Sequence, residues 1–87
     1  MPRVIISHDI REVDRWLAGK SERAAAMPGA VGVTDLVAMD GSNRAAVTFE
    51  TDDLDALRAL LESMPPEVAA QAESHGVVPP FTVYVER

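Results

Sequence analysis

The sequence predicts one small α+β domain, in which a four-stranded antiparallel sheet carries helices on one of its faces. Its 87 residues provide enough chain for a single hydrophobic core and not for two. Four short segments are rich in β-branched residues or alternate between apolar and polar residues, as strands do. Between them, two segments place apolar residues at helical spacing after an acidic start. The resulting order, βαββαβ, is that of the ferredoxin-like fold and covers residues 1–87 as one domain.

The chain opens with a predicted strand and a predicted helix. Residues 3–8 are rich in β-branched side chains and form the strand. Asp9 then suits the N-cap of a helix, and Glu12, three positions later, completes a capping box. Residues 10–20 carry their apolar side chains at helical spacing, with charged residues on the opposite side. We therefore expect the first helix to begin directly after the first strand.

Residues 21–26 either continue this helix or form a second short one, and we expect Pro28 to end the helical stretch. Residues 32–39 alternate and are predicted to form the second strand, followed by a hairpin turn over 40–43 that contains Asp-Gly. The remaining segments repeat the pattern of strand, acidic cap and helix. They are a strand over 44–50, a cap over 51–53, a helix over 54–64, a shorter helix over 67–75, an extended connector over 77–80 and a strand over 81–86.

The composition excludes several classes of function. The net charge is −6, and the eight basic residues are scattered along the chain without forming a cluster. Binding to nucleic acid or to an anionic membrane requires a positive patch, so we expect neither partner. The apolar stretch after Arg3 is only three residues long, too short for a signal peptide or a membrane span, so we expect a soluble, cytoplasmic protein.

The lack of cysteine raises the question of how so short a chain is stabilised. A domain of this size buries about 60–65% of the surface of its unfolded chain, which leaves little stability to spare. Without cysteine, disulfides and thiolate metal sites are excluded. A partner subunit is the remaining common source of stability. We therefore expect the protein to associate with a second copy of itself.

The predicted sheet has two unlike faces. Alternation assigns the apolar side chains of the third and fourth strands to the face under the helices: Ala45, Val47, Phe49, Phe81, Val83 and Val85. The opposite face receives a semi-polar set: Ala46, Thr48, Glu50, Thr82, Tyr84 and Glu86. The first strand is apolar on both of its sides, which argues against leaving this second face bare. We expect a homodimer formed through this helix-free face.

Several short motifs spread over the chain carry a family resemblance. They are Ser7-His8 at the end of the first strand, Asp14-Arg15-Trp16, Arg23 before the alanine run, Gly32-Val33-Thr34, Asp40 to Arg44, the leucine-rich second helix and Gly76 to Pro80. With them the sequence resembles small proteins of the dimeric α/β-barrel superfamily, related to the antibiotic-biosynthesis monooxygenase-like proteins. The resemblance implies two sheets packed face to face about a two-fold axis. It also implies a cavity, either between sheet and helices or between the two sheets.

Six residues are candidates for a site. His8 and Tyr84 are the candidate catalytic residues, because an imidazole can act as a general base and a phenol can anchor a ligand oxygen. With Ser7, Trp16, Thr48 and Thr82 they form the predicted ligand-binding set. Each also has a structural interpretation. His8 can bond a strand or helix end, Tyr84 can lie in a dimer interface and Trp16 can pack in the core.

Other titratable residues favour structural roles. His75 precedes Gly76 at a helix C-terminus, where a histidine is favourably placed against the helix dipole. Its alternative role, an axial haem ligand, comes only from the superfamily resemblance. Glu50 and Glu86 share a face of the sheet and could pair for acid–base work, but both lie at strand ends near solvent.

No metal-ligand spacing and no nucleotide-binding motif occurs in the sequence, so we expect neither a metal nor an organic cofactor. Two functions remain open. The first is a homodimer that binds a small apolar or aromatic molecule without catalysing an identifiable reaction. The alternative is a cofactor-independent monooxygenase, cyclase or isomerase acting on a small aromatic or polyketide-like substrate.

Overall fold

A computed structural model describes residues 1–27 and 29–87, so Pro28, the expected helix stop, lies outside the described residues. The elements follow the βαββαβ order, with each helical region divided into two short helices. They are β1 (Arg3–Ile10), α1 (Val13–Ala18), α2 (Lys20–Ala26), β2 (Val31–Val37), β3 (Arg44–Glu50), α3 (Leu54–Glu62), α4 (Pro66–Ser74) and β4 (Val77–Val85). The predicted α+β class is confirmed.

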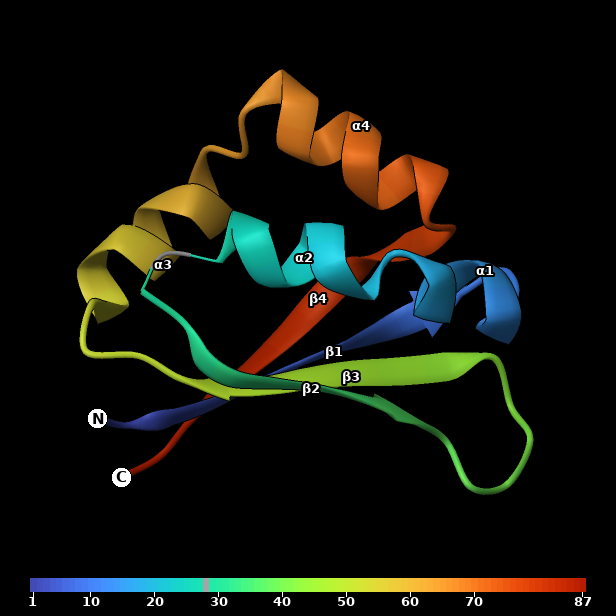
Figure 1. Ribbon diagram of the computed structural model, residues 1–87, viewed down its shortest axis with the longest axis horizontal. Coiled ribbons are helices and arrows are strands. Elements are labelled where there is room, and N and C mark those ends of the chain that lie inside the picture. The colour runs from blue at the N-terminus through green and yellow to red at the C-terminus, as the bar shows by residue number, and fades with distance from the viewer. Residues whose placement is uncertain (28) are drawn as a thin grey trace.

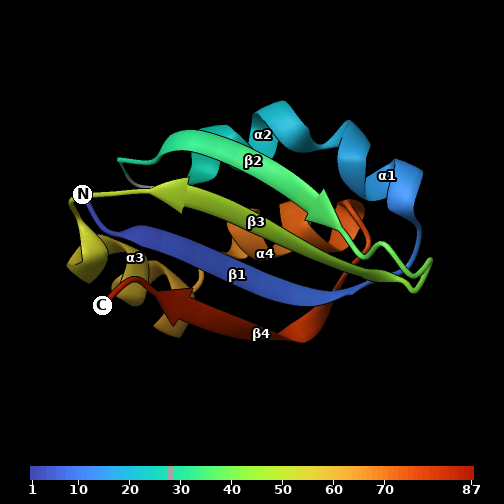
Figure 2. The same cartoon turned by 90° about the horizontal axis from the view of Figure 1, so that it is seen from below.

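The four strands form one antiparallel sheet in the order β2-β3-β1-β4 (Figure 2). The central strand β1 pairs Ile6 with Val47 of β3 on one side and with Val83 of β4 on the other. This order is the ferredoxin-like arrangement, because β1 lies between β3 and β4, the two strands that the second helical crossover connects. β2 and β4 are the two edge strands.

All four helices lie on one face of the sheet, and the other face is bare (Figure 1). Along β1, every second side chain points toward the helices and is buried, from Val4 to Ile10. The main core cluster under the helices consists of Val4, Ile6, Val47, Phe49 and Leu57. A second cluster contains Ile10, Trp16 and Ala45. The predicted assignment of side chains to the two faces is therefore confirmed.

The predicted capping box at Asp9 is wrong. β1 continues through Asp9 to Ile10, because the Ile10 amide donates to the Asn43 carbonyl oxygen at 2.9 Å. The next amide, that of Arg11, donates to the Gly76 carbonyl oxygen at 2.8 Å. These long-range bonds extend the strand beyond what its own residues favour. Helix α1 then begins at Val13, and its N-cap residue makes no side-chain capping bond.

The predicted connector over 77–80 is also wrong, since β4 already begins at Val77. Its pairing with β1 passes from Ser7 opposite Thr82 to Asp9 opposite Val78, so a bulge lies between these pairs and contains Pro79 and Pro80. Proline has no amide hydrogen to donate, and it is tolerated in sheets on edge strands and at bulges. β4 is such an edge strand, which explains why the two prolines can lie within it.

Smaller differences concern the first helix and the second strand. The helical region after β1 breaks at Gly19 into two helices, one of the two arrangements that we considered. β2 starts at Val31 and ends at Val37, two residues before the predicted end. The hairpin then turns through Gly41, whose φ of 82° is accessible to glycine at little cost. No helix of the described residues is long and apolar enough to cross a membrane.

Candidate functional site

The sheet separates the six predicted site residues into two groups. Ser7, Thr48, Thr82 and Tyr84 project from the bare face, whereas His8 and Trp16 lie on the side of the helices. The separation follows from strand alternation, because Ser7 and His8 are neighbours on β1 and must point to opposite faces. One site cannot contain all six side chains within a single chain.

The bare face has a shallow hollow at one end. It has a volume of about 390 Å³ and is lined by Ser7, His8, Asp9, Arg44, Ala45, Pro80, Thr82 and Tyr84. Ser7 and Thr82 lie directly opposite each other, and Tyr84 lies opposite Ile5. Thr48 is also opposite Ile5, from the other side, so β1 separates Thr48 from Tyr84 by roughly 10 Å. The expected grouping of Tyr84 with Thr82 is therefore present, whereas Thr48 is two strands away.

Arg3 crosses the other end of the bare face. Its guanidinium donates to Glu50 at 2.8 Å and to the Thr48 hydroxyl at 3.4 Å, and its amide donates to the Glu86 carboxylate at 2.9 Å. Glu50 and Glu86 thus both bond to a basic residue at an exposed rim. Glu50 pairs with the Arg3 guanidinium, whereas Glu86 accepts from the Arg3 backbone amide.

His8 is buried, with 8% of its surface exposed. Its ring meets Trp16 and Phe81 edge to face, each at a centroid distance of 5.6 Å. Nδ1 lies 2.9 Å from the Asp9 carbonyl oxygen. A carbonyl can only accept, so Nδ1 carries the proton and Nε2 is the basic nitrogen of the neutral ring. Burial lowers the pKa of His8, which keeps this ring neutral near pH 7.

Trp16 belongs to a buried polar cluster that the sequence interpretation missed. The Arg23 guanidinium carbon lies 4.0 Å above the Trp16 ring. Arg23 also pairs with Asp35 of β2, with Nη2 and Oδ2 at 2.8 Å, and donates to the Trp16 carbonyl oxygen at 3.0 Å. The sequence feature that indicates this cluster is Asp35, a charged residue that alternation places with Val33 and Val37 on the helix-facing side of β2. A charge at such a position requires a buried partner.

A second feature that the sequence interpretation missed is a cleft beside β4, on the side of the helices. We call it the β4 cleft. It has a volume of about 320 Å³ and is lined by Leu54, Leu57, Arg58, Leu61, Glu62, Val83, Val85 and Arg87. A separate hollow of about 330 Å³ follows along β4 and is lined by Arg11, Met64, Ala69, Ala72, Glu73, Val77, Pro79 and Phe81. Helices α3 and α4 cover β4 incompletely, so none of its residues is fully buried.

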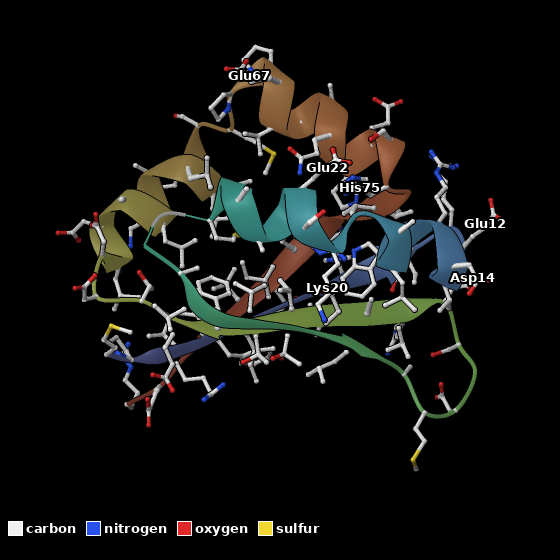
Figure 3. All side chains as sticks on the ribbon, in the orientation of Figure 1. Glu12, Asp14, Lys20, Glu22, Glu67 and His75 are labelled. Atoms are coloured by element: carbon white, nitrogen blue, oxygen red, sulfur yellow. The ribbon has the colours of Figure 1, made fainter. Side chains whose placement is uncertain are left out.

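His75 occupies a packing position at the end of α4. Its ring fills the space above Gly19, and its Nε2 lies 3.7 Å from Glu22 Oε2, as Figure 3 shows between α2 and α4. Gly19 is therefore required by close approach, since any β-carbon there would overlap the His75 ring. Among the described residues, no group of three or more His, Cys, Asp and Glu side chains could hold a metal ion.

Comparison with solved structures identifies the fold. A structure described as an antibiotic biosynthesis monooxygenase superposes with a TM-score of 0.65 and 14% identity, over 100% of this chain and 97% of that one. SnoaB from Streptomyces nogalater, described as a cofactor-independent oxygenase, gives a TM-score of 0.62 and 18% identity over 99% and 92% of the two chains. This chain has the antibiotic biosynthesis monooxygenase fold.

A conserved protein from Methanosarcina mazei Go1 has the same monooxygenase-like fold, with a TM-score of 0.63 and 13% identity over 99% of this chain and 90% of that one. No family model matches the sequence, and no curated protein does. The resemblance expected from the sequence motifs is confirmed at the level of the fold. A shared fold does not determine a reaction.

Proposed function

We propose that the protein is a homodimer that binds a small, largely apolar or aromatic molecule in the β4 cleft. The observation that carries the proposal is the lining of this cleft. Leu54, Leu57 and Leu61 of α3 face Val83 and Val85 of β4 across it. Leu57 is buried, whereas Val83 and Val85 are exposed, and a ligand that removes their apolar surface from water gains about 25 cal/mol for each Å² buried. The volume lies in the range of small-molecule sites.

The bare face of the sheet supports the dimer. Leu36 is 44% exposed and Tyr84 is 61% exposed, and Ile5 and Ala46 lie between them on the neighbouring strands. A second copy would cover these side chains and close the hollow beside Ser7, Thr82 and Tyr84. In this arrangement Thr48, Thr82 and Tyr84 belong to the interface, while His8 and Trp16 stay buried under the helices.

Binding to the cleft is tested with tetralin (1,2,3,4-tetrahydronaphthalene), a bicyclic hydrocarbon. We expect a dissociation constant below about 1 mM, with amide shifts in α3, α4 and β4 by NMR. The variant Val83→Phe fills the cleft and should weaken binding on the order of ten-fold. Leu17→Phe, at an exposed apolar position of α1 outside the cleft lining, is the matched control and should leave binding unchanged. Shifts confined to the bare face would refute the cleft as the site.

His8 supports a second candidate function, a cofactor-independent monooxygenase. Its neutral ring has a basic Nε2 and packs against Phe81, which lines the hollow next to the cleft. A base of this kind would take the proton of a bound phenol and leave an electron-rich phenolate. Dioxygen would then oxidise the carbon para to the phenolate: one oxygen atom becomes the second carbonyl of a para-quinone, the other leaves as water, and the phenol supplies all four electrons. The test is oxygen consumption with polycyclic phenols. His8→Gln should abolish turnover but keep tetralin binding, and equal rates in both proteins would contradict this role.

A further inference from the structure

The β4 cleft combines aliphatic walls with charged side chains. Its apolar lining residues are all leucine or valine: Leu54, Leu57, Leu61, Val83 and Val85. The other lining residues, Arg58, Glu62 and Arg87, are exposed to solvent, and we call them the rim. A site of this composition suits a ligand with an aliphatic body and a polar end that stays at the rim.

Both arginines of the rim have free side chains. Three of the eight basic residues pair with carboxylates, and a fourth, Arg15, donates to two backbone carbonyl oxygens. Within residues 1–27 and 29–87, neither Arg58 nor Arg87 forms a side-chain hydrogen bond or an ion pair. The two basic residues that remain, Arg11 and Lys20, lie outside the cleft lining. A chain with a net charge of −6 thus places two unpaired arginines at one apolar cleft.

Glu62 is the one acidic residue of the lining, and it does not neutralise Arg58. It follows Arg58 by one turn of α3. At this spacing an acidic residue followed by a basic one is the favourable order for pairing, and the order here is the reverse. No ion pair joins these two described side chains. The rim therefore carries an excess of positive charge, in two guanidinium groups whose forked donors match a carboxylate.

The spacing of the leucines indicates how long the apolar body of the ligand is. Leu54 and Leu61 lie two turns apart on α3, which is roughly 10 Å along the helix axis. An extended chain of about eight carbons covers this distance. α3 lies over the C-terminal half of β4, where Val83 and Val85 complete the walls and Arg87 follows shortly after the strand (Figure 2).

We propose that the ligand of the β4 cleft is an aliphatic carboxylate of about eight carbons, whose carboxylate binds Arg58 and Arg87. This inference rests on the proposed binding in the β4 cleft. It assigns the chain of the ligand to the leucines of α3 and the valines of β4. Because the rim is exposed, the carboxylate stays in contact with water and avoids the desolvation cost of a buried charge.

The test compares octanoate with 1-octanol, which has the same chain length and no charge. At pH 7 we expect octanoate to bind on the order of five-fold more tightly, with amide shifts in α3 and β4 by NMR. The difference should shrink as NaCl rises from about 50 mM to about 500 mM, because salt screens charges at an exposed rim.

Two double variants locate the effect. Arg58→Gln with Arg87→Gln should equalise the affinities for octanoate and 1-octanol, because the carboxylate loses both guanidinium partners. Arg11→Gln with Lys20→Gln is the matched control. It removes the same charge from two unpaired residues outside the cleft lining, and it should preserve the difference.

The outcomes separate this inference from the proposed function. If octanoate, 1-octanol and tetralin all fail to bind, the β4 cleft is not a ligand site and both proposals fail. If octanoate and 1-octanol bind equally, or if tetralin alone binds, the proposed function stands and this inference fails. A preference for octanoate that persists in the Arg58→Gln, Arg87→Gln variant would also overturn the inference, because the two arginines would then not be the carboxylate site.

Discussion

His8 makes the stability of this fold depend on pH. Burial between Trp16 and Phe81 lowers its pKa below 6.5, its ordinary value. The unfolded chain therefore binds more protons than the folded chain at mildly acidic pH, so the free energy of unfolding must fall as the pH decreases. The same burial that provides a neutral base at pH 7 thus destabilises the protein in acid.

We predict that the free energy of unfolding decreases from about pH 7 to about pH 5. In His8→Phe, which retains an aromatic ring and cannot titrate, the decrease over this interval should be smaller. Urea denaturation at several pH values measures both slopes. Parallel curves for the two proteins would show that His8 is not the titrating group.

A substitution at Gly19 tests how the His75 ring packs against this residue. We predict that Gly19→Ala destabilises the protein by about 1–3 kcal/mol, because the new β-carbon overlaps the His75 ring. The backbone of Gly19, with φ of −89°, is accessible to alanine, so backbone strain does not contribute. In a His75→Ala background the same substitution should cost nearly nothing. Thermal denaturation of the four proteins provides the double-mutant cycle, and additive effects would contradict the predicted contact.

At the scale of the elements, the ion pair between Arg23 and Asp35 connects the edge strand β2 to the helix layer. Most β2 side chains are exposed, yet Asp35 bonds Arg23 of α2 with both oxygens. Breaking such a pair leaves an uncompensated buried charge. We predict that Arg23→Met lowers the free energy of unfolding by about 3–5 kcal/mol. Replacing both partners, as Arg23→Met with Asp35→Leu, should recover most of this loss in chemical denaturation, and a double variant no more stable than Arg23→Met would refute this account.

The helices and strands themselves follow from local sequence patterns. The predicted and observed elements differ where residues distant in the sequence form hydrogen bonds. Alternation along 44–50 and the leucine spacing over 54–64 were enough to predict β3 and α3 and the faces that they bury. Asp9 has the chemistry of a helix cap, but its strand is extended by bonds to Asn43 and Gly76. Such partners are invisible to local patterns.

The candidate site was predicted less completely than the fold. Alternation alone implies that Ser7 and His8 point to opposite faces, so the separation of the six residues was contained in the sequence. The β4 cleft could not be predicted from the sequence, because it depends on the distance between β4 and the helices α3 and α4. The Arg23–Asp35 pair had a sequence signal only in Asp35, and its partner could be identified only once the helix was placed on the sheet.

At the scale of the whole molecule, the bare face of the sheet is the surface through which we propose that two copies associate. A chain of 87 residues without cysteine has little reserve of stability, and this face exposes Leu36 and Tyr84. We predict that Leu36→Arg weakens the dimer and lowers the melting temperature, because it would bury an unpaired charge in the interface. Leu17→Arg, at a comparably exposed position on α1, is the control and should leave the mass in solution unchanged.

The most direct test of a dimer closed over the bare face is the mass in solution. Light scattering coupled to size exclusion, at about 10 µM protein, should give about twice the chain mass of 9.4 kDa. In the Leu36→Arg variant the mass should fall toward that of one chain. A wild-type protein that elutes as a single chain of 9.4 kDa at this concentration would contradict the account.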